Sequence, residues 1–168
     1  MKRIALLVLV LATSVLAQES WQPFASPEGR FQILMPGTPQ LIEGGFRAVT
    51  GGGTYTVTYA DLGAEELAEG PEAVYQKARQ RLIGARKVEE RGFREVPSHG
   101  LVCKELRYVS APRAGHPGDS GLARWCLAGG RLYLVEAVVP RGMSSSEVLS
   151  FVGSFRVLMP ETTPTPEQ

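Results

Sequence analysis

Residues 101–140 decide the fold of this chain; they read LVCKELRYVSAPRAGHPGDSGLARWCLAGGRLYLVEAVVP. This stretch predicts three consecutive antiparallel strands at 101–109, 122–128 and 131–139, because β-branched, aromatic and apolar residues recur there between turn-forming residues. We expect this meander to form the middle of a sheet, with the other elements packed onto it.

The two cysteines of the chain, Cys103 and Cys126, lie on the first two strands of this meander. If they face one another as antiparallel partners, the same register places Glu105 opposite Arg124, which is an opposite-charge pair. One register therefore satisfies the cysteines, the charges and the apolar pattern on the other face. We predict a disulfide between them, worth about 3 kcal/mol in the chain-entropy model, with two free thiols as the alternative.

The first residues have the organisation of a secretory signal peptide, residues 1–17. Lys2 and Arg3 precede a short apolar run, and Val-Leu-Ala at 15–17 forms a small-residue cleavage site. The run is shorter than the about 20 residues that span a bilayer, so the mature chain is expected not to span a membrane. We predict cleavage after Ala17 and a secreted or periplasmic protein, with an uncleaved N-terminal anchor as the alternative.

The remaining residues are expected to form one domain, at 18–159, followed by a disordered tail at 160–168 that is rich in Pro, Thr and Glu. Lys and Arg number 18 against 17 Asp and Glu, so no strong electrostatic field favours nucleic acid. We therefore expect no nucleic-acid partner.

The segments on both sides of the meander predict further strands and two helices. The alternating residues 30–35 predict a strand, and residues 41–50 and 54–59 predict a hairpin with a glycine tip. A loop is expected at 61–70, then a helix from Pro71 to Gly84, and then a charged edge strand or hairpin arm at 87–96. A second amphipathic helix is expected to dock on the sheet through Val148, Phe151, Val152 and Phe155.

Strands outnumber helices, and hairpins join consecutive strands, which predicts an α+β fold with an antiparallel β-sheet and helices packed on its faces. Four stretches, in this order, resemble the Mog1/PsbP-like fold family and especially its small exported bacterial members: SPEGRFQILMP (26–36), YTVTY (55–59), RLYLV (131–135) and FVGSFR (151–156). The resemblance implies an α–β sandwich with a non-enzymatic role, as an extrinsic subunit of a membrane complex, a partner of a small GTPase or a chaperone. It assigns no site residues.

The sequence Gly-Asp-Ser-Gly at 118–121 resembles the nucleophile motif of trypsin-like serine proteases. A hydrolase would use Ser120 as the nucleophile and His116 as the general base. Leu122 stands where that motif has a further glycine, and neither His99 nor His116 lies in the family's histidine motif. A hydrophilic hairpin loop at 110–121 explains the same residues through their turn chemistry. We therefore predict no catalytic residue and no enzyme activity.

A zinc site is the alternative use of the two cysteines, together with the two histidines, because thiolates and imidazoles suit zinc. The chain lacks the Cys-x-x-Cys or His-x-x-x-His spacing that such a site usually has. We predict no metal and no cofactor.

Glu136 is unusual because it lies in the middle of an apolar strand, on the face that carries Leu132 and Leu134. A carboxylate at such a position requires a partner or water. We expect it to pair with an arginine from a helix, or to line a pocket. Glu136, Arg124 and His116 are therefore the candidate pocket or binding residues.

These observations predict an exported, non-catalytic binding or accessory protein of the cell envelope, with an unidentified protein or membrane-complex partner. Such a protein should expose an apolar patch or groove near one sheet face or near the loop 110–121. The alternative is a carrier of a small ligand or lipid, which should contain an enclosed apolar cavity with Glu136 or Arg124 at its mouth.

Overall fold

The computed structural model describes residues 20–143 and 146–158, so the predicted signal peptide and the predicted tail lie outside the described residues. The described elements follow one another along the chain as β1 (Trp21–Ser26), β2 (Phe31–Pro36), β3 (Gln40–Ile42), β4 (Gly45–Thr50), β5 (Gly53–Asp61), α1 (Ala64–Ala68), α2 (Pro71–Arg86), β6 (Glu89–Ser98), β7 (Leu101–Val109), β8 (Asp119–Ala128), β9 (Arg131–Pro140), α3 (Ser146–Ser154) and β10 (Arg156–Val157). None of the helices in these ranges has the length and apolar character needed to cross a membrane.

The larger sheet has seven antiparallel strands in the order β3-β4-β5-β9-β8-β7-β6. The predicted meander is therefore confirmed as its middle, and β8 begins at Asp119, three residues before its predicted start. Cys103 lies opposite Cys126 and Glu105 opposite Arg124. The disulfide is formed, which confirms the predicted pairing and register.

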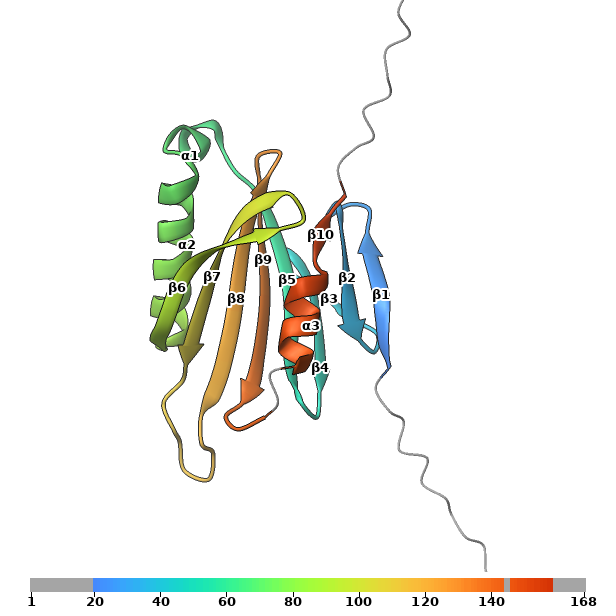
Figure 1. The fold of residues 1–168 in the computed structure, drawn as a ribbon, viewed down its shortest axis with the longest axis vertical. Helices are drawn as coiled ribbons and strands as arrows, with labels where there is room; N and C mark the ends of the chain where they lie inside the picture. Colours follow the sequence, from blue (N-terminus) through green and yellow to red (C-terminus); the bar gives the residue numbers. More distant parts are fainter. Residues whose placement is uncertain (1–19, 144–145, 159–168) are drawn as a thin grey trace, which may run out of the picture.

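Two layers cover the larger sheet, one on each face (Figure 1). Helix α2 packs on one face, where Tyr75 and Leu82 join a core with Leu106 and Trp125 of the central strands. Helix α3 and a second sheet, in the order β1-β2-β10, cover the other face. The result is the α+β sandwich that the excess of strands and their hairpin connections predict.

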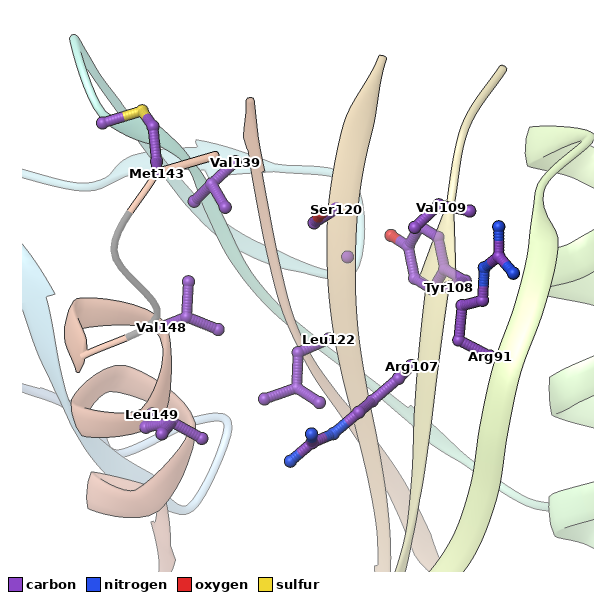
Figure 2. Close-up of a pocket in the computed structure, with 11 residues that line it drawn as sticks. Arg91, Arg107, Tyr108, Val109, Ser120, Leu122, Val139, Met143, Val148 and Leu149 are labelled. Atoms are coloured by element: carbon purple, nitrogen blue, oxygen red, sulfur yellow. The ribbon is translucent and has the colours of Figure 1, made fainter. Parts of the chain in front are cut away.

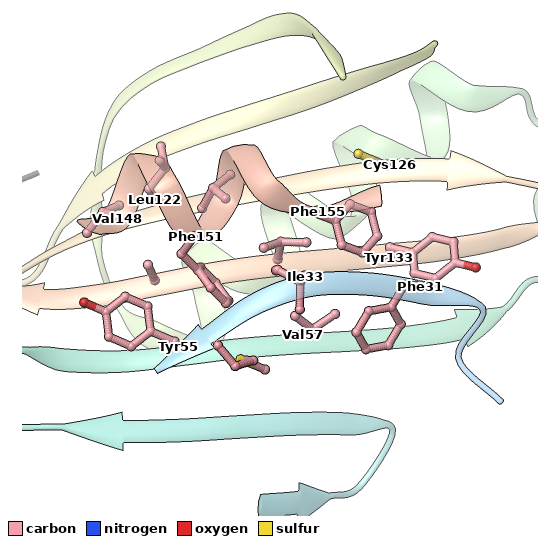
Figure 3. Packing of buried hydrophobic residues seen from close by; sticks show 14 of the residues in the cluster. Phe31, Ile33, Tyr55, Val57, Leu122, Cys126, Tyr133, Val148, Phe151 and Phe155 are labelled. Carbon is pink, nitrogen blue, oxygen red and sulfur yellow. The ribbon is translucent and has the colours of Figure 1, made fainter. Parts of the chain in front are cut away.

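The main core lies between β2, α3 and the central strands of the larger sheet (Figure 3). Phe31 is fully buried there and packs against Phe155 and Tyr133, with ring centroids 5.9 and 6.5 Å away. Val148, Phe151 and Val152 of α3 are buried against the same core, which confirms the predicted amphipathic face. This docking fixes where α3 lies relative to β7, β8 and β9.

Several predicted boundaries are wrong. Gly84 does not end the first long helix: α2 continues to Arg86 and ends where Lys87 adopts a left-handed conformation. The predicted loop at 61–70 contains the short helix α1, and the predicted strand 41–50 is divided into β3 and β4 by a turn at Gly44, whose φ is +70°. Strand β1 was not predicted, because Pro23 interrupts its pattern; it pairs with β2 at the edge of the smaller sheet, where proline is tolerated.

Candidate functional site

A groove with a volume of about 310 Å³ lies between α3 and the end of the larger sheet where β7 stops and β8 begins (Figure 2). We call it the α3 groove. Its lining includes the apolar residues Leu122, Val139, Met143, Val148 and Leu149. Figure 2 shows the side chains of Leu122 and Val148 directed toward one another from β8 and α3.

The α3 groove has a buried floor and an exposed lip. Which residues belong to each follows from the periodicity of strands and helices. Leu122 and Val139 occupy inward positions of neighbouring strands, and Val148 belongs to the docked stripe of α3, so all three are buried. Leu149 follows Val148 by one position and therefore turns away from that stripe. Leu149 is 49% exposed and Met143 is 44% exposed, so the lip of the groove presents apolar surface to water.

Two arginines line the groove on the side away from α3. Arg107 extends from β7 toward the groove, and its side chain is about half exposed (Figure 2). Arg91 lies on β6 at a register shift between Glu90 and Gly92, where a β-bulge adds a residue to the strand. Arg91 forms an exposed ion pair with Glu89 at 3.1 Å, and such pairs contribute little stability.

Glu105 of β7 is only 1% exposed and forms ion pairs with Arg94, Arg107 and Arg124. Arg124 and Arg94 donate to its two carboxylate oxygens at 2.8 and 2.9 Å, while Arg107 Nε lies 3.7 Å away. Burial alone would raise the pKa of Glu105. The hydrogen bonds from Arg124 and Arg94 outweigh burial and lower this pKa below its ordinary value, so the carboxylate remains charged.

Arg124, a predicted binding residue, is not part of the lining of the α3 groove. Its side chain is 13% exposed and donates to the Val152 carbonyl at 3.2 Å as well as to Glu105. The neighbouring Gly153 carbonyl lies 3.2 Å from His99 Nε2. Both carbonyls belong to the last turn of α3, where they lack helical partners and a positive charge is favourable. Arg124 therefore caps α3 and ties it to the sheet.

Glu136, the second predicted binding residue, lies on the opposite face of the sheet under α2. It is buried, forms an ion pair with Arg86 of α2, and accepts a hydrogen bond of 2.5 Å from the Tyr108 hydroxyl. The predicted pairing with an arginine from a helix is confirmed. The pKa of Tyr108 is raised, mainly by burial and then by the negative charge of Glu136. The Tyr108 hydroxyl therefore stays protonated and can donate to Glu136. Glu136 also lines a hollow of about 300 Å³ with Leu132 and Leu134.

The side chain of His116, the third predicted binding residue, pairs only with Gly118 and with Asp119 at the start of β8 among the described residues. Its Nδ1 accepts a hydrogen bond of 3.1 Å from the Gly118 backbone, and its Nε2 lies 3.7 Å from Asp119. No hydrogen bond within the described ranges joins Ser120 to either histidine, so the nucleophile–base pair of the hydrolase alternative is not assembled. Ser120 instead lines the α3 groove.

The zinc alternative also lacks its ligands, because both cysteines are in the disulfide. In residues 20–143 and 146–158, no group of three His, Cys, Asp or Glu side chains is arranged to hold a metal ion.

Three functional candidates, Arg91, Arg94 and Arg107, were not singled out from the sequence. The register of β7 and β8 predicts the contact of Glu105 with Arg124 only. Extending that register into the preceding hairpin would have placed Arg94 opposite Glu105, as β6 does in the structure.

Comparison with known proteins identifies the fold and leaves the function open. No family model and no curated protein matches the sequence. Cyanobacterial PsbP from Synechocystis sp. PCC 6803 matches with a TM-score of 0.62 and 14% identity, over 85% of this chain and 95% of that chain. A structure from Bacteroides thetaiotaomicron, solved at 1.50 Å resolution, matches with a TM-score of 0.59 and 14% identity, over 82% of this chain and 48% of that chain. This chain therefore spans about half the length of the Bacteroides protein.

Proposed function

Starting from the PsbP-like fold of this chain, we propose that it is an exported, non-catalytic binding protein of the cell envelope that holds a segment of a partner protein in the α3 groove. One observation carries the proposal: Met143 and Leu149 are nearly half exposed beside a buried apolar floor. Apolar surface that borders a groove is characteristic of interaction sites. The disulfide supports export, because such bonds persist in oxidising compartments.

A protein partner suits the α3 groove better than a small ligand or lipid does. Ligand sites usually bury 70–90% or more of the bound molecule. The lip of the groove is open, so Met143 and Leu149 need a partner that brings its own surface to cover them. The carrier alternative expects Glu136 or Arg124 at the mouth of a cavity, but Arg86 and Tyr108 already hold the Glu136 carboxylate.

Site-specific photocrosslinking tests this function in the producing cell. A benzoylphenylalanine in place of Leu149 places the reactive group at the lip of the groove. The same group in place of Val102, an exposed aliphatic residue of β7 outside the groove, is the matched control. We expect one defined envelope protein to be crosslinked from position 149 and not from position 102, with the crosslinked segment identified by mass spectrometry.

A second substitution makes the test specific for the groove surface. Met143→Glu places a charge at the lip without disturbing a buried residue, so its thermal unfolding should match that of the unmodified protein. Loss of the position-149 adduct in this background would support the proposal. Equal adducts from positions 149 and 102, or an adduct that Met143→Glu leaves unchanged, would show that the groove is not the binding surface.

A further inference from the structure

We infer that the segment held in the α3 groove is both apolar and acidic: it places an apolar side chain on the floor and Asp or Glu carboxylates on Arg107 and Arg91. This inference rests on the proposed function and names the chemistry of its partner. It is argued from the charge balance at the groove, from the availability of the two guanidinium groups, and from the nature of the neighbouring sheet edge.

Positive charge is in excess around Glu105, beside the groove. Arg91 pairs with Glu89 alone, whereas three guanidinium groups, those of Arg94, Arg107 and Arg124, share the single carboxylate of Glu105. Two positive charges are thus left without a compensating carboxylate in this cluster. The whole chain is nearly neutral, with a formal net charge of +1, so the excess is a property of this site and not of the overall composition.

Arg107, which lines the groove, has the guanidinium group that is most available to a ligand. Arg94 and Arg124 occupy the two oxygens of Glu105 at normal hydrogen-bond lengths. Arg107 Nε is left at 3.7 Å from the same carboxylate, and the Arg107 guanidinium donates no hydrogen bond within the described residues. A guanidinium has five N–H donors in a planar arrangement that suits a carboxylate. Arg107 can therefore bind an external carboxylate without losing an internal hydrogen bond.

The edge strand β6 carries Arg91. The strand is rich in charged residues and contains the bulge at Glu90 and Gly92, and both features disfavour pairing with an added strand. Recognition must then come from side chains that enter the groove, not from backbone pairing. An apolar side chain flanked by carboxylates satisfies the floor and the arginines together.

Selection from a random dodecapeptide library displayed on phage tests this inference with the purified, disulfide-bonded protein. We expect selected peptides to carry Asp or Glu within a few residues of Leu, Ile, Phe or Met. Arg107→Gln should weaken their binding about three- to ten-fold, as expected for the loss of one charge-assisted pair. The matched control Arg47→Gln, at an exposed arginine of β4 outside the groove, should change binding less than about two-fold.

The outcomes separate the inference from the proposed function. One outcome is that the selected peptides contain no excess of Asp or Glu and still lose binding to Leu149→Asp. That result would overturn the acidic preference and leave the groove as a protein-binding site. Peptides that bind equally to Leu149→Asp and Arg107→Gln would overturn both. Displacement of the peptides by sodium dodecanoate, with the loss again caused by Arg107→Gln, would overturn the protein partner in favour of an acidic amphiphile.

Discussion

Replacing the buried Glu105 by Gln should destabilise the protein more than removing the charge of an exposed carboxylate on the sheet. Gln keeps the shape of the side chain but removes the charge that compensates Arg124 and Arg94. Removing one partner of a buried ion pair typically costs about 3–5 kcal/mol. Arg94 is exposed and loses little, whereas Arg124 is 13% exposed and keeps its hydrogen bond to α3. We therefore expect the lower end of this range, about 3 kcal/mol.

The effect of Glu105→Gln should depend on pH in a defined direction. The pKa of Glu105 in the folded protein lies below its ordinary value of 4.5. A depressed folded-state pKa contributes stability that is fully present above the unfolded-state pKa and is lost as the pH falls through the folded-state pKa. The gap between the two proteins should be largest near neutral pH and should narrow progressively below about pH 4.5.

Urea unfolding at pH 7 and at pH 3.5, followed by the fluorescence of Trp21 and Trp125, measures this gap with the disulfide intact. Glu95→Gln is the matched control, because the Glu95 carboxylate is exposed and pairs with Lys104 at the surface. It should cost less than about 1 kcal/mol. A loss below about 1 kcal/mol for Glu105→Gln at pH 7, or a gap that is the same at both pH values, would refute the assignment of Glu105 as the buried charge that holds Arg124.

Three further changes test other parts of the fold. Tyr108→Phe removes the hydroxyl that donates to the buried Glu136, and should lower the free energy of unfolding by about 1–3 kcal/mol in urea; an unchanged value would mean that water replaces the donor. The double variant Cys103→Ala/Cys126→Ala should lose about 3 kcal/mol in calorimetry, and a loss below about 1 kcal/mol would contradict the loop-closure account. Gly84 lies at an open, exposed position within α2, so Gly84→Ala should raise the free energy of unfolding by about 0.5–1 kcal/mol. A lower free energy of unfolding would indicate a contact that the structure does not show.

The features of the fold that could be predicted are those set by local sequence patterns, within one hairpin or one helix. The register of β7 and β8 follows from Cys103 and Cys126 together with Glu105 and Arg124, since all four pair across one hairpin. The docked face of α3 follows from its helical periodicity. Strand β1 has no such local signal: Trp21 is placed by packing on Tyr55, with ring centroids 5.2 Å apart, and this contact exists only after folding.

The α3 groove could not be predicted because it is assembled from distant segments. Its floor requires Val148 to lie beside Leu122, which only the docking of α3 brings about. Its charge requires Arg107 of β7 to lie on the same face as Leu122 and α3. Its arginine lining also includes Arg91, the extra residue that the bulge adds to β6 between Glu90 and Gly92. A pattern of alternation in the sequence contains no information about such a bulge.

The position of β2 between β1 and β10 also has a consequence for the order in which the chain can fold. The central hairpins join neighbouring segments, whereas the Leu34 N–H donates to Ser154 Oγ across 120 positions, and β2 pairs with β10 over a similar span. Contacts between distant positions require large loops to close and form slowly. The core beneath β2 can therefore close only after the last strand has been synthesised. For the exported envelope protein that we propose, such late closure would keep the chain unfolded for longer before it crosses the membrane.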